Sequence, residues 1–384
     1  AVKAFDVGQC LGENGGFVGR SERTVTHDGN PYDDQKILPG PAANTKARRS
    51  DGCAATVGRT RGGADRQPAM TSNRAATGER PAACCGRFAP SPTGWLHFGS
   101  LVAAVGSFLD ARASGGRWLL RIEDIDQQRT VPGAADAILR ALAGLAFEWD
   151  GEVLYQSRRL DVYRAALNQL RDSGDVYPCA CSRREIAARA PALGVDGGLV
   201  YPGTCRSGLP PGRSARSWRL LAPAQEISFD DRVQGTQRQN LATVVGDFVL
   251  LRADGQFAYQ LAVVADDAAQ GIDSVVRGAD LLDSTPRQIW LAQRLQLPVP
   301  AYAHLPLVSN AAGEKLSKQT HAEAIDPAAG SPLLAAALEF LGHVVPADVR
   351  HAPLPEFWRW AIANWSISRV PARRSAIVGH RLPP

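Results

Sequence analysis

The amino-acid sequence predicts an α/β protein whose main unit is a doubly wound parallel sheet. Two observations support this prediction. Strand-like apolar runs alternate with helical patterns before residue 176 and again after residue 240, an order typical of parallel sheets covered by helices. Between these stretches, residues 176–240 break the alternation with a cysteine cluster and many Pro and Gly residues, which indicates an insertion. The 384 residues, 45% of them apolar, are enough for two to three domains.

The first half of the sheet unit, residues 81–175, has the clearest alternation. Its helix after the first strand carries apolar side chains at a helical spacing on one face, from Leu101 to Leu109. The next strand is apolar and ends in the acidic sequence Glu123-Asp124-Ile125-Asp126. The expected elements are a strand at residues 86–89, a helix through 101–109, a strand at 118–122 and a helix at 134–145.

The second half of the sheet unit, residues 241–330, resumes the alternation after the insertion. We expect a strand at residues 248–251, a turn at 253–255 and a further apolar element at 257–264. The last segment, residues 331–384, has helical patterns at 332–341 and 356–364 and is expected to be a short helical region.

The first 80 residues differ from the rest of the chain. They are rich in Gly, Ala, Arg, Thr, Asn and Asp and show no sustained apolar periodicity, so they are expected to be disordered. Met70 is the only methionine. An alternative is therefore that translation begins at Met70 and that residues 1–69 are not part of the protein.

The composition excludes a membrane protein but does not by itself indicate nucleic-acid binding. No uncharged apolar run reaches the roughly 18 residues needed to span a bilayer, and the first residues do not resemble a secretory signal. The formal net charge is +5, with 12 basic and 9 acidic residues in the first 80. The remaining charge is nearly balanced, so a cytoplasmic enzyme is the expectation.

The first candidate site is the turn between the first strand and the first helix, Pro90-Ser91-Pro92-Thr93-Gly94, followed by Trp95-Leu96-His97-Phe98-Gly99-Ser100. Free backbone N–H groups at the start of the helix favour an anion such as a triphosphate. Gly94 and Gly99 allow close approach of a ligand to the backbone, and His97 can donate to a phosphate oxygen.

A second candidate site is marked by lysines. The sequence has 43 basic residues, but only Lys315 and Lys318 are lysines after Lys46. A chain that otherwise uses arginine has a compact ammonium group at two positions three residues apart, which indicates a requirement for lysine there.

The two sites together resemble the paired signature of class I aminoacyl-tRNA synthetases, a His-x-Gly helix start and a Lys-x-Ser-Lys loop. With Arg87-Phe88-Ala89-Pro90-Ser91-Pro92-Thr93-Gly94 and Arg121-Ile122-Glu123-Asp124-Ile125-Asp126, the chain is similar to their glutamyl branch over about residues 86–330. The resemblance implies the synthetase form of the Rossmann-type fold, with residues 81–175 and 241–330 as the two halves of the catalytic domain. It also implies ATP-dependent activation of L-glutamate, with Mg²⁺ bound to ATP.

The resemblance also implies roles for individual residues. His97, Lys318 and Lys315 match the catalytic positions that hold the ATP phosphates, and Gly99 and Ser100 belong to the same ATP site. The implied glutamate pocket consists of Arg87, Phe88, Ala89, Pro90, Ser91, Glu123, Tyr259 and Arg277. An arginine can hold the side-chain carboxylate in a way that a glutamine amide cannot reproduce, and Glu123 would meet the α-ammonium group.

The insertion holds the third candidate site, Cys179, Cys181 and Cys205. Three thiolates suit a structural zinc ion, one per chain, although reduced and unligated cysteines remain an alternative. A small subgroup of glutamyl-synthetase-like proteins has a similar Cys-x-Cys…Tyr-x₃-Cys pattern, which implies Tyr201 as a fourth ligand. Phenolate is an unusual zinc ligand, so the chemistry alone leaves Tyr201 open. In that subgroup, residues 176–240 would bind both zinc and the acceptor RNA.

Residues 320–384 are too few for the anticodon-reading region of a conventional glutamyl-tRNA synthetase. The chain therefore resembles the truncated subgroup that activates glutamate without tRNA and transfers it to queuosine at the first anticodon position of tRNA(Asp). We expect a monomer with ATP, L-glutamate and queuosine-containing tRNA(Asp) as partners. A truncated conventional synthetase that charges a tRNA 3′ end and an inactive zinc-stabilised RNA-binding module are the alternatives.

Overall fold

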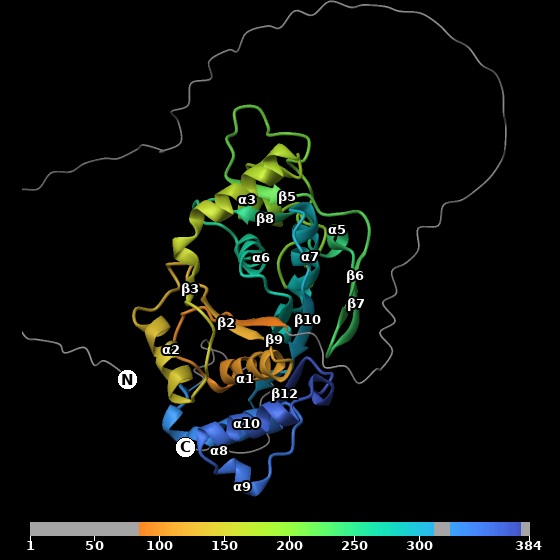
Figure 1. Ribbon diagram of the computed structural model, residues 1–384. Coiled ribbons are helices and arrows are strands. Elements are labelled where there is room, and N and C mark those ends of the chain that lie inside the picture. Colours follow the sequence, from red (N-terminus) through yellow and green to blue (C-terminus); the bar gives the residue numbers. More distant parts are fainter. Residues whose placement is uncertain (1–83, 311–322, 378–384) are drawn as a thin grey trace, which may run out of the picture. The chain divides into compact units, whose positions relative to one another are not determined.

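A computed structural model describes residues 84–310 and 323–377 of the chain (Figure 1). The first half of the catalytic unit forms a parallel sheet in the order β1-β2-β3. Its strands and helices are β1 (Cys85–Phe88), α1 (Phe98–Ala113), β2 (Arg117–Ile122), α2 (Ala134–Gly144) and β3 (Leu154–Tyr155). The strand–helix alternation predicted for this half is present, with the boundaries of each predicted element shifted by a few residues.

The second half forms a sheet in the order β7-β6-β10-β9, in which β6, β10 and β9 are parallel and β7 is antiparallel to β6. These strands are β6 (Ile227–Asp231), β7 (Gly235–Gln239), β9 (Ser274–Gly278) and β10 (Ala301–Leu305). The N–H of Asp273, just before β9, donates to the carbonyl of Cys85 in β1 at 3.1 Å. The two sheets therefore meet at β1 and β9. From this point the chain adds strands in opposite directions, with β2 and β3 beyond β1, and β10 and β6 beyond β9.

The insertion contributes a separate antiparallel sheet in the order β4-β5-β8. Its elements are β4 (Val176–Cys179), α4 (Arg183–Ala187), β5 (Ser217–Leu220), α5 (Leu241–Val244) and β8 (Phe248–Leu251). Strand pairing thus crosses the boundary expected at residue 240. β6 lies before it but joins the parallel sheet, and β8 lies after it but pairs with the insertion. Apolar runs indicate strands but not their partners, so the sequence could not show this exchange.

The remaining helices cover the sheets and end the described chain. They are α3 (Leu160–Asp172), α6 (Tyr259–Ala269), α7 (Thr285–Arg294), α8 (Gly330–Phe340), α9 (Ala347–Arg350) and α10 (Leu354–Asn364), with a parallel pair of short strands, β11 (Leu307–Ser309) and β12 (Ser375–Ile377). The apolar segment expected at residues 257–264 is mainly helix α6. The helical character predicted for the C-terminal segment is present.

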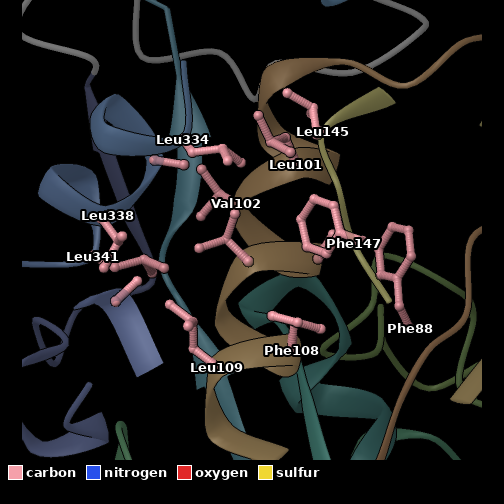
Figure 2. Close-up of a cluster of buried hydrophobic side chains, with 14 of the residues drawn as sticks. Phe88, Leu101, Val102, Phe108, Leu109, Leu145, Phe147, Leu334, Leu338 and Leu341 are labelled. Atoms are coloured by element: carbon pink, nitrogen blue, oxygen red, sulfur yellow. The ribbon is translucent and has the colours of Figure 1, made fainter. Parts of the chain in front are cut away.

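The C-terminal helices pack against α1 in the first of two large cores. This core contains Leu101, Val102 and Phe108 of α1, and Leu334 and Leu338 of α8. Figure 2 shows these side chains gathered around α1. Burial of side chains of this size stabilises the fold by about 1.5 to 3 kcal/mol each. The second core lies around α3, α6 and α7. No helix among the described residues is both long and apolar enough to cross a bilayer.

Candidate active site

A cavity of about 470 Å³ opens where the two halves of the catalytic unit meet, beside the carboxyl ends of β1, β2 and β9. Ligand sites in doubly wound folds occur at this kind of switch in strand order. The cavity is lined by every described residue that the sequence placed in the glutamate or ATP site: Arg87, Phe88, Ala89, Pro90, Ser91, His97, Gly99, Ser100, Glu123, Tyr259 and Arg277.

Arg277, at the end of β9, is one of the residues that line this cavity. Its Nε donates to His304 Nε2 at 3.0 Å, and its Nη2 donates to Thr285 Oγ1 at 2.9 Å. Its Nη1 is buried and has no hydrogen-bond partner among the described residues. A buried guanidinium nitrogen without a partner is costly unless a ligand supplies an acceptor. Arg277 is therefore suited to an acidic ligand.

Arg87, from β1, is held by the protein itself. Its Nε and Nη2 donate to the two carboxylate oxygens of Asp267 at 3.0 and 3.4 Å. Arg121 Nη2 donates to the same Asp267 at 2.7 Å and to Glu123 at 3.4 Å. Burial opposes ionisation of Asp267, but Arg121 and Arg87 outweigh it and hold the pKa of Asp267 below its usual value. The network therefore fixes the Arg87 side chain at the cavity wall.

Glu123 follows β2 and faces the same cavity. Burial raises the pKa of Glu123, while the nearby Arg121 and Arg87 oppose this rise. A bound cation such as an α-ammonium group would favour the ionised carboxylate. Burial is also the main reason that the pKa of the Tyr259 hydroxyl is raised, and the neighbouring Glu123 adds to the rise. Tyr259 therefore stays a neutral phenol that can donate one hydrogen bond.

His97 is the N-cap residue of α1, a helix of 16 residues. Its Nδ1 accepts from the backbone N–H of Ser100 at 3.3 Å, and Ser100 Oγ lies 2.9 Å from its Nε2. The backbone of His97 forms a β-bridge with Ala324. Leu307 and Val308 of β11 also line the cavity. Lys315 and Lys318, the predicted loop lysines, lie outside the described residues, as do Met70 and the rest of residues 1–83.

The cysteines of the insertion form a separate cluster. The sulfur atoms of Cys179, Cys181 and Cys205 all lie within 4.8 Å of one another. The Tyr201 hydroxyl lies 3.3 Å from Cys179 Sγ and 3.6 Å from Cys181 Sγ. Gly246 permits this arrangement, because a Cβ there would lie 2.5 Å from the carbonyl oxygen of Tyr201. Tetrahedral zinc with Zn–S bonds of about 2.3 Å separates its sulfur ligands by about 3.8 Å, so the donor set fits a zinc ion.

The chemistry of the cluster also favours a metal. Burial opposes ionisation of Cys179, but the hydrogen bond with Tyr201 and the nearby Arg219 outweigh it and lower the pKa of Cys179 to about 7. The Arg219 guanidinium also lies over the ring of Tyr201, 3.8 Å from its centroid. A thiol that ionises near neutral pH is a better metal ligand than an ordinary cysteine.

Residues 84–328 match the family model described as tRNA synthetases class I (E and Q), catalytic domain. The glutamyl-Q tRNA(Asp) synthetase of Dechloromonas aromatica is 59% identical over 293 residues, which are 76% of this chain and 97% of that protein. The protein of the same name from Chromobacterium violaceum is 61% identical over 75% of this chain and 95% of its own length. The chain belongs to the glutamyl-Q tRNA(Asp) synthetase family.

Solved structures agree with membership of this family. The chain superposes on a glutamate tRNA ligase from Elizabethkingia meningosepticum with a TM-score of 0.63 and 26% identity, covering 77% of this chain and 67% of that one. A glutamate-tRNA synthetase from Elizabethkingia anophelis gives a TM-score of 0.62 at 27% identity, covering 77% and 68%. The chain is therefore an α/β ligase of the class I aminoacyl-tRNA synthetase type.

Several polar residues behind the cavity belong to no motif in the sequence. Asp267 was not singled out, although two adjacent acidic residues inside the apolar helical segment Leu261-Ala262-Val263-Val264-Ala265-Asp266-Asp267 are a signal of a buried charge network. His304 is likewise the one polar residue in the apolar run Ala301-Tyr302-Ala303-His304-Leu305. Asp267, on α6, contacts Arg87 of β1, and His304 contacts Arg277 on the neighbouring strand; no local pattern could show these partners.

Proposed function

We propose that this protein uses ATP to convert L-glutamate to glutamyl-adenylate without tRNA, and then transfers the glutamyl group to the queuosine of tRNA(Asp) at the first anticodon position. The observation that supports it most directly is one cavity lined by both Glu123 and Arg277, whose Nη1 has no partner among the described residues. These are the two groups that an acidic amino acid requires. The relatives at 59–61% identity are named glutamyl-Q tRNA(Asp) synthetases, which supports the choice of acceptor.

Glutamate would bind with its side-chain carboxylate at Arg277 and its α-ammonium group at Glu123. Arg87 would add positive potential near the carboxylate but cannot turn to grip it, because Asp267 already binds two of its nitrogens. Ser91 and Tyr259 would complete the polar lining, and Phe88, Ala89 and Pro90 would shape the wall. A neutral glutamine amide would leave the Arg277 charge without a counter-charge.

The reaction would begin when the α-carboxylate of glutamate attacks the α-phosphorus of ATP and pyrophosphate leaves. Gly99 and Ser100 lie in the first turn of α1. The Ser100 N–H donates to His97 Nδ1, so the other N–H groups of this turn and the positive end of the helix dipole would attract the phosphate oxygens. His97 and Lys318, with Lys315, would donate to the phosphates as negative charge develops. Mg²⁺ bound with ATP would supply further charge neutralisation. An acceptor hydroxyl of queuosine would then displace AMP from the carbonyl carbon.

The insertion would carry the zinc and contact the acceptor RNA. Cys179, Cys181 and Cys205 would hold one structural zinc ion, with Tyr201 as the fourth ligand. A closed tetrahedral site stabilises a small region with little core of its own. Because its substrates are ATP and tRNA, we place the enzyme in the cytoplasm, and we propose that it acts as a monomer.

Two assays test the proposal. Purified protein should catalyse glutamate-dependent exchange of pyrophosphate into ATP in the absence of tRNA. It should then transfer radiolabelled glutamate to tRNA(Asp) that contains queuosine, and not to the same tRNA with unmodified guanosine. Labelling of the unmodified tRNA at its 3′ end would instead support a truncated conventional synthetase. Absence of exchange would support an inactive RNA-binding module.

A further inference from the structure

Arg277 is supported, on the side away from the cavity, by polar side chains from two neighbouring strands. Asp231 ends β6, His304 lies on β10, and His304 is the register partner of Arg277 on β9. Asp231 Oδ2 lies 2.6 Å from His304 Nδ1. His304 Nε2 then accepts from Arg277 Nε at 3.0 Å. His304 is completely buried, and Asp231 and Arg277 are at most 5% exposed, so water does not compete with these contacts.

The direction of each hydrogen bond follows from the charges. Arg277 Nε is a donor only, so His304 Nε2 must carry a lone pair. Burial opposes ionisation of Asp231, but the hydrogen bond with His304 outweighs it and lowers the pKa of Asp231 to about 2. Burial also lowers the pKa of His304 to about 4. Near neutral pH the imidazole is therefore neutral, and the Asp231 carboxylate keeps its single proton on Nδ1.

A second contact completes the fixation of the guanidinium group. Thr285 Oγ1, at the start of α7, accepts from Arg277 Nη2 at 2.9 Å, and its hydroxyl lies 3.2 Å from the carbonyl oxygen of Leu281. The plane of the guanidinium is set by partners on Nε and on Nη2. Nη1 is left as the nitrogen without a partner among the described residues, and Arg277 lines the cavity.

We propose that Asp231 and His304 are positioning residues that make Arg277 selective for a carboxylate side chain of the amino-acid substrate. The inference rests on the proposed function, which supplies glutamate as the substrate. With Nε and Nη2 engaged, Arg277 cannot turn away or meet an amide NH₂ group without conflict. A ligand that offers two acceptor oxygens satisfies Nη1, whereas a glutamine side chain also presents a donor. The reversed His304 tautomer would place two N–H groups against each other.

The test compares four variants in glutamate-dependent pyrophosphate exchange. His304→Leu removes the acceptor for Arg277, and Asp231→Asn permits the reversed tautomer. Both should raise the KM for glutamate about 10- to 100-fold, the usual effect of losing a hydrogen bond to a charged group. The KM for ATP should stay within about twofold of wild type. His304→Gln keeps an acceptor that can reach Nε and should recover most of the loss. Thr285→Val should show a smaller rise.

Selectivity is the second measurement, because a merely structural role would not change it. The ratio of kcat/KM for glutamate over glutamine should fall in His304→Leu and recover in His304→Gln. The matched control is His343→Gln, since His343 is also buried but stacks on Trp365 among the C-terminal elements. This control should lower thermal stability without changing the KM for glutamate. If His304→Leu fails to fold, the KM for glutamate and the ratio of kcat/KM for glutamate over glutamine are compared in Asp231→Asn and Thr285→Val instead.

The outcomes separate the positioning role from the proposed function. A wild-type protein without glutamate-dependent exchange would contradict the proposed function. A wild-type protein that exchanges normally, beside folded His304 and Asp231 variants with unchanged glutamate KM and selectivity, would contradict the positioning role. Equal losses in the Gln and Leu variants, with both KM values altered together, would also contradict it.

Discussion

Asp267 of α6 holds Arg87 of β1 through both of its carboxylate oxygens, at 3.0 and 3.4 Å. The same carboxylate accepts from Arg121 at 2.7 Å. An arginine that the sequence motif places in the amino-acid pocket is therefore engaged before any ligand arrives. Among the described residues, Arg277 of the neighbouring strand β9 is the lining arginine whose guanidinium keeps a nitrogen without a partner.

Replacing Asp267 by Asn should leave two buried arginines with an incomplete counter-charge. Removing one partner of a buried ion pair typically costs about 3 to 5 kcal/mol, so the free energy of unfolding should fall by a similar amount. Urea denaturation measures this change. Asp161→Asn is the control, because Asp161 pairs with Arg164 at the surface and should change stability by less than about 1 kcal/mol. Equal effects of the two substitutions would contradict the role of Asp267.

Arg277→Gln should weaken binding of glutamate far more than binding of ATP. Loss of a charge-assisted contact to the substrate carboxylate costs about 2 to 3 kcal/mol, or roughly 30- to 150-fold in the KM for glutamate. Steady-state pyrophosphate exchange at varied concentrations of glutamate and of ATP gives the KM for each substrate separately. The matched control is Arg164→Gln at an exposed position, which should be near normal. A glutamate KM that stays within twofold in Arg277→Gln would exclude this arginine from substrate binding.

Zinc analysis tests the cysteine cluster. Purified protein should contain about one zinc ion per chain, and Cys179→Ser or Cys205→Ser should lower this content and the thermal stability. Cys84 lies outside the cluster, so the Cys84→Ser protein should retain its zinc ion. Tyr201→Phe should weaken zinc binding less, because three thiolates and a water molecule can complete the coordination. Full zinc content in both cluster variants would refute this ligand set.

Lys318 lies outside the described residues, and its role is a prediction from the motif. Lys318→Ala should slow exchange about 10²- to 10³-fold, the usual loss when a donor to developing charge is removed from an active site. Lys318→Arg should recover only part of this rate, since a planar guanidinium places its charge differently. Lys46→Ala serves as the control and should be active. Normal exchange in Lys318→Ala would contradict the synthetase interpretation of the loop.

The buried His304 should make the protein less stable in mild acid. Burial lowers its pKa from 6.5 to about 4 in the folded state, against the opposing effect of Asp231. The unfolded chain therefore binds more protons between these pH values, and the free energy of unfolding falls as the pH falls through this window. The loss should reach up to about 3 kcal/mol. His304→Gln should lack this component, and urea denaturation at pH 7 and pH 4.5 compares the two proteins.

Several features of the protein follow from its sequence alone. The apolar runs and helical spacings predict the strand–helix order around β1, α1 and β2, because periodicity is set locally by whether a segment has one buried face or two. The resemblance to a family places His97 in the ATP site and Glu123, Tyr259 and Arg277 in the glutamate pocket, and all four line one cavity. The cysteine spacing likewise predicts the cluster in the insertion.

Only the tertiary structure shows which strands pair and which polar groups meet behind the site. β6 and β8 exchange sheets across the expected boundary, since an apolar strand carries no local record of its partner. The contacts of Asp267 with Arg87 and of His304 with Arg277 join residues 180 and 27 positions apart. Such contacts depend on how buried charges are compensated once the sheet has formed, and burial is a property of the whole fold rather than of any segment.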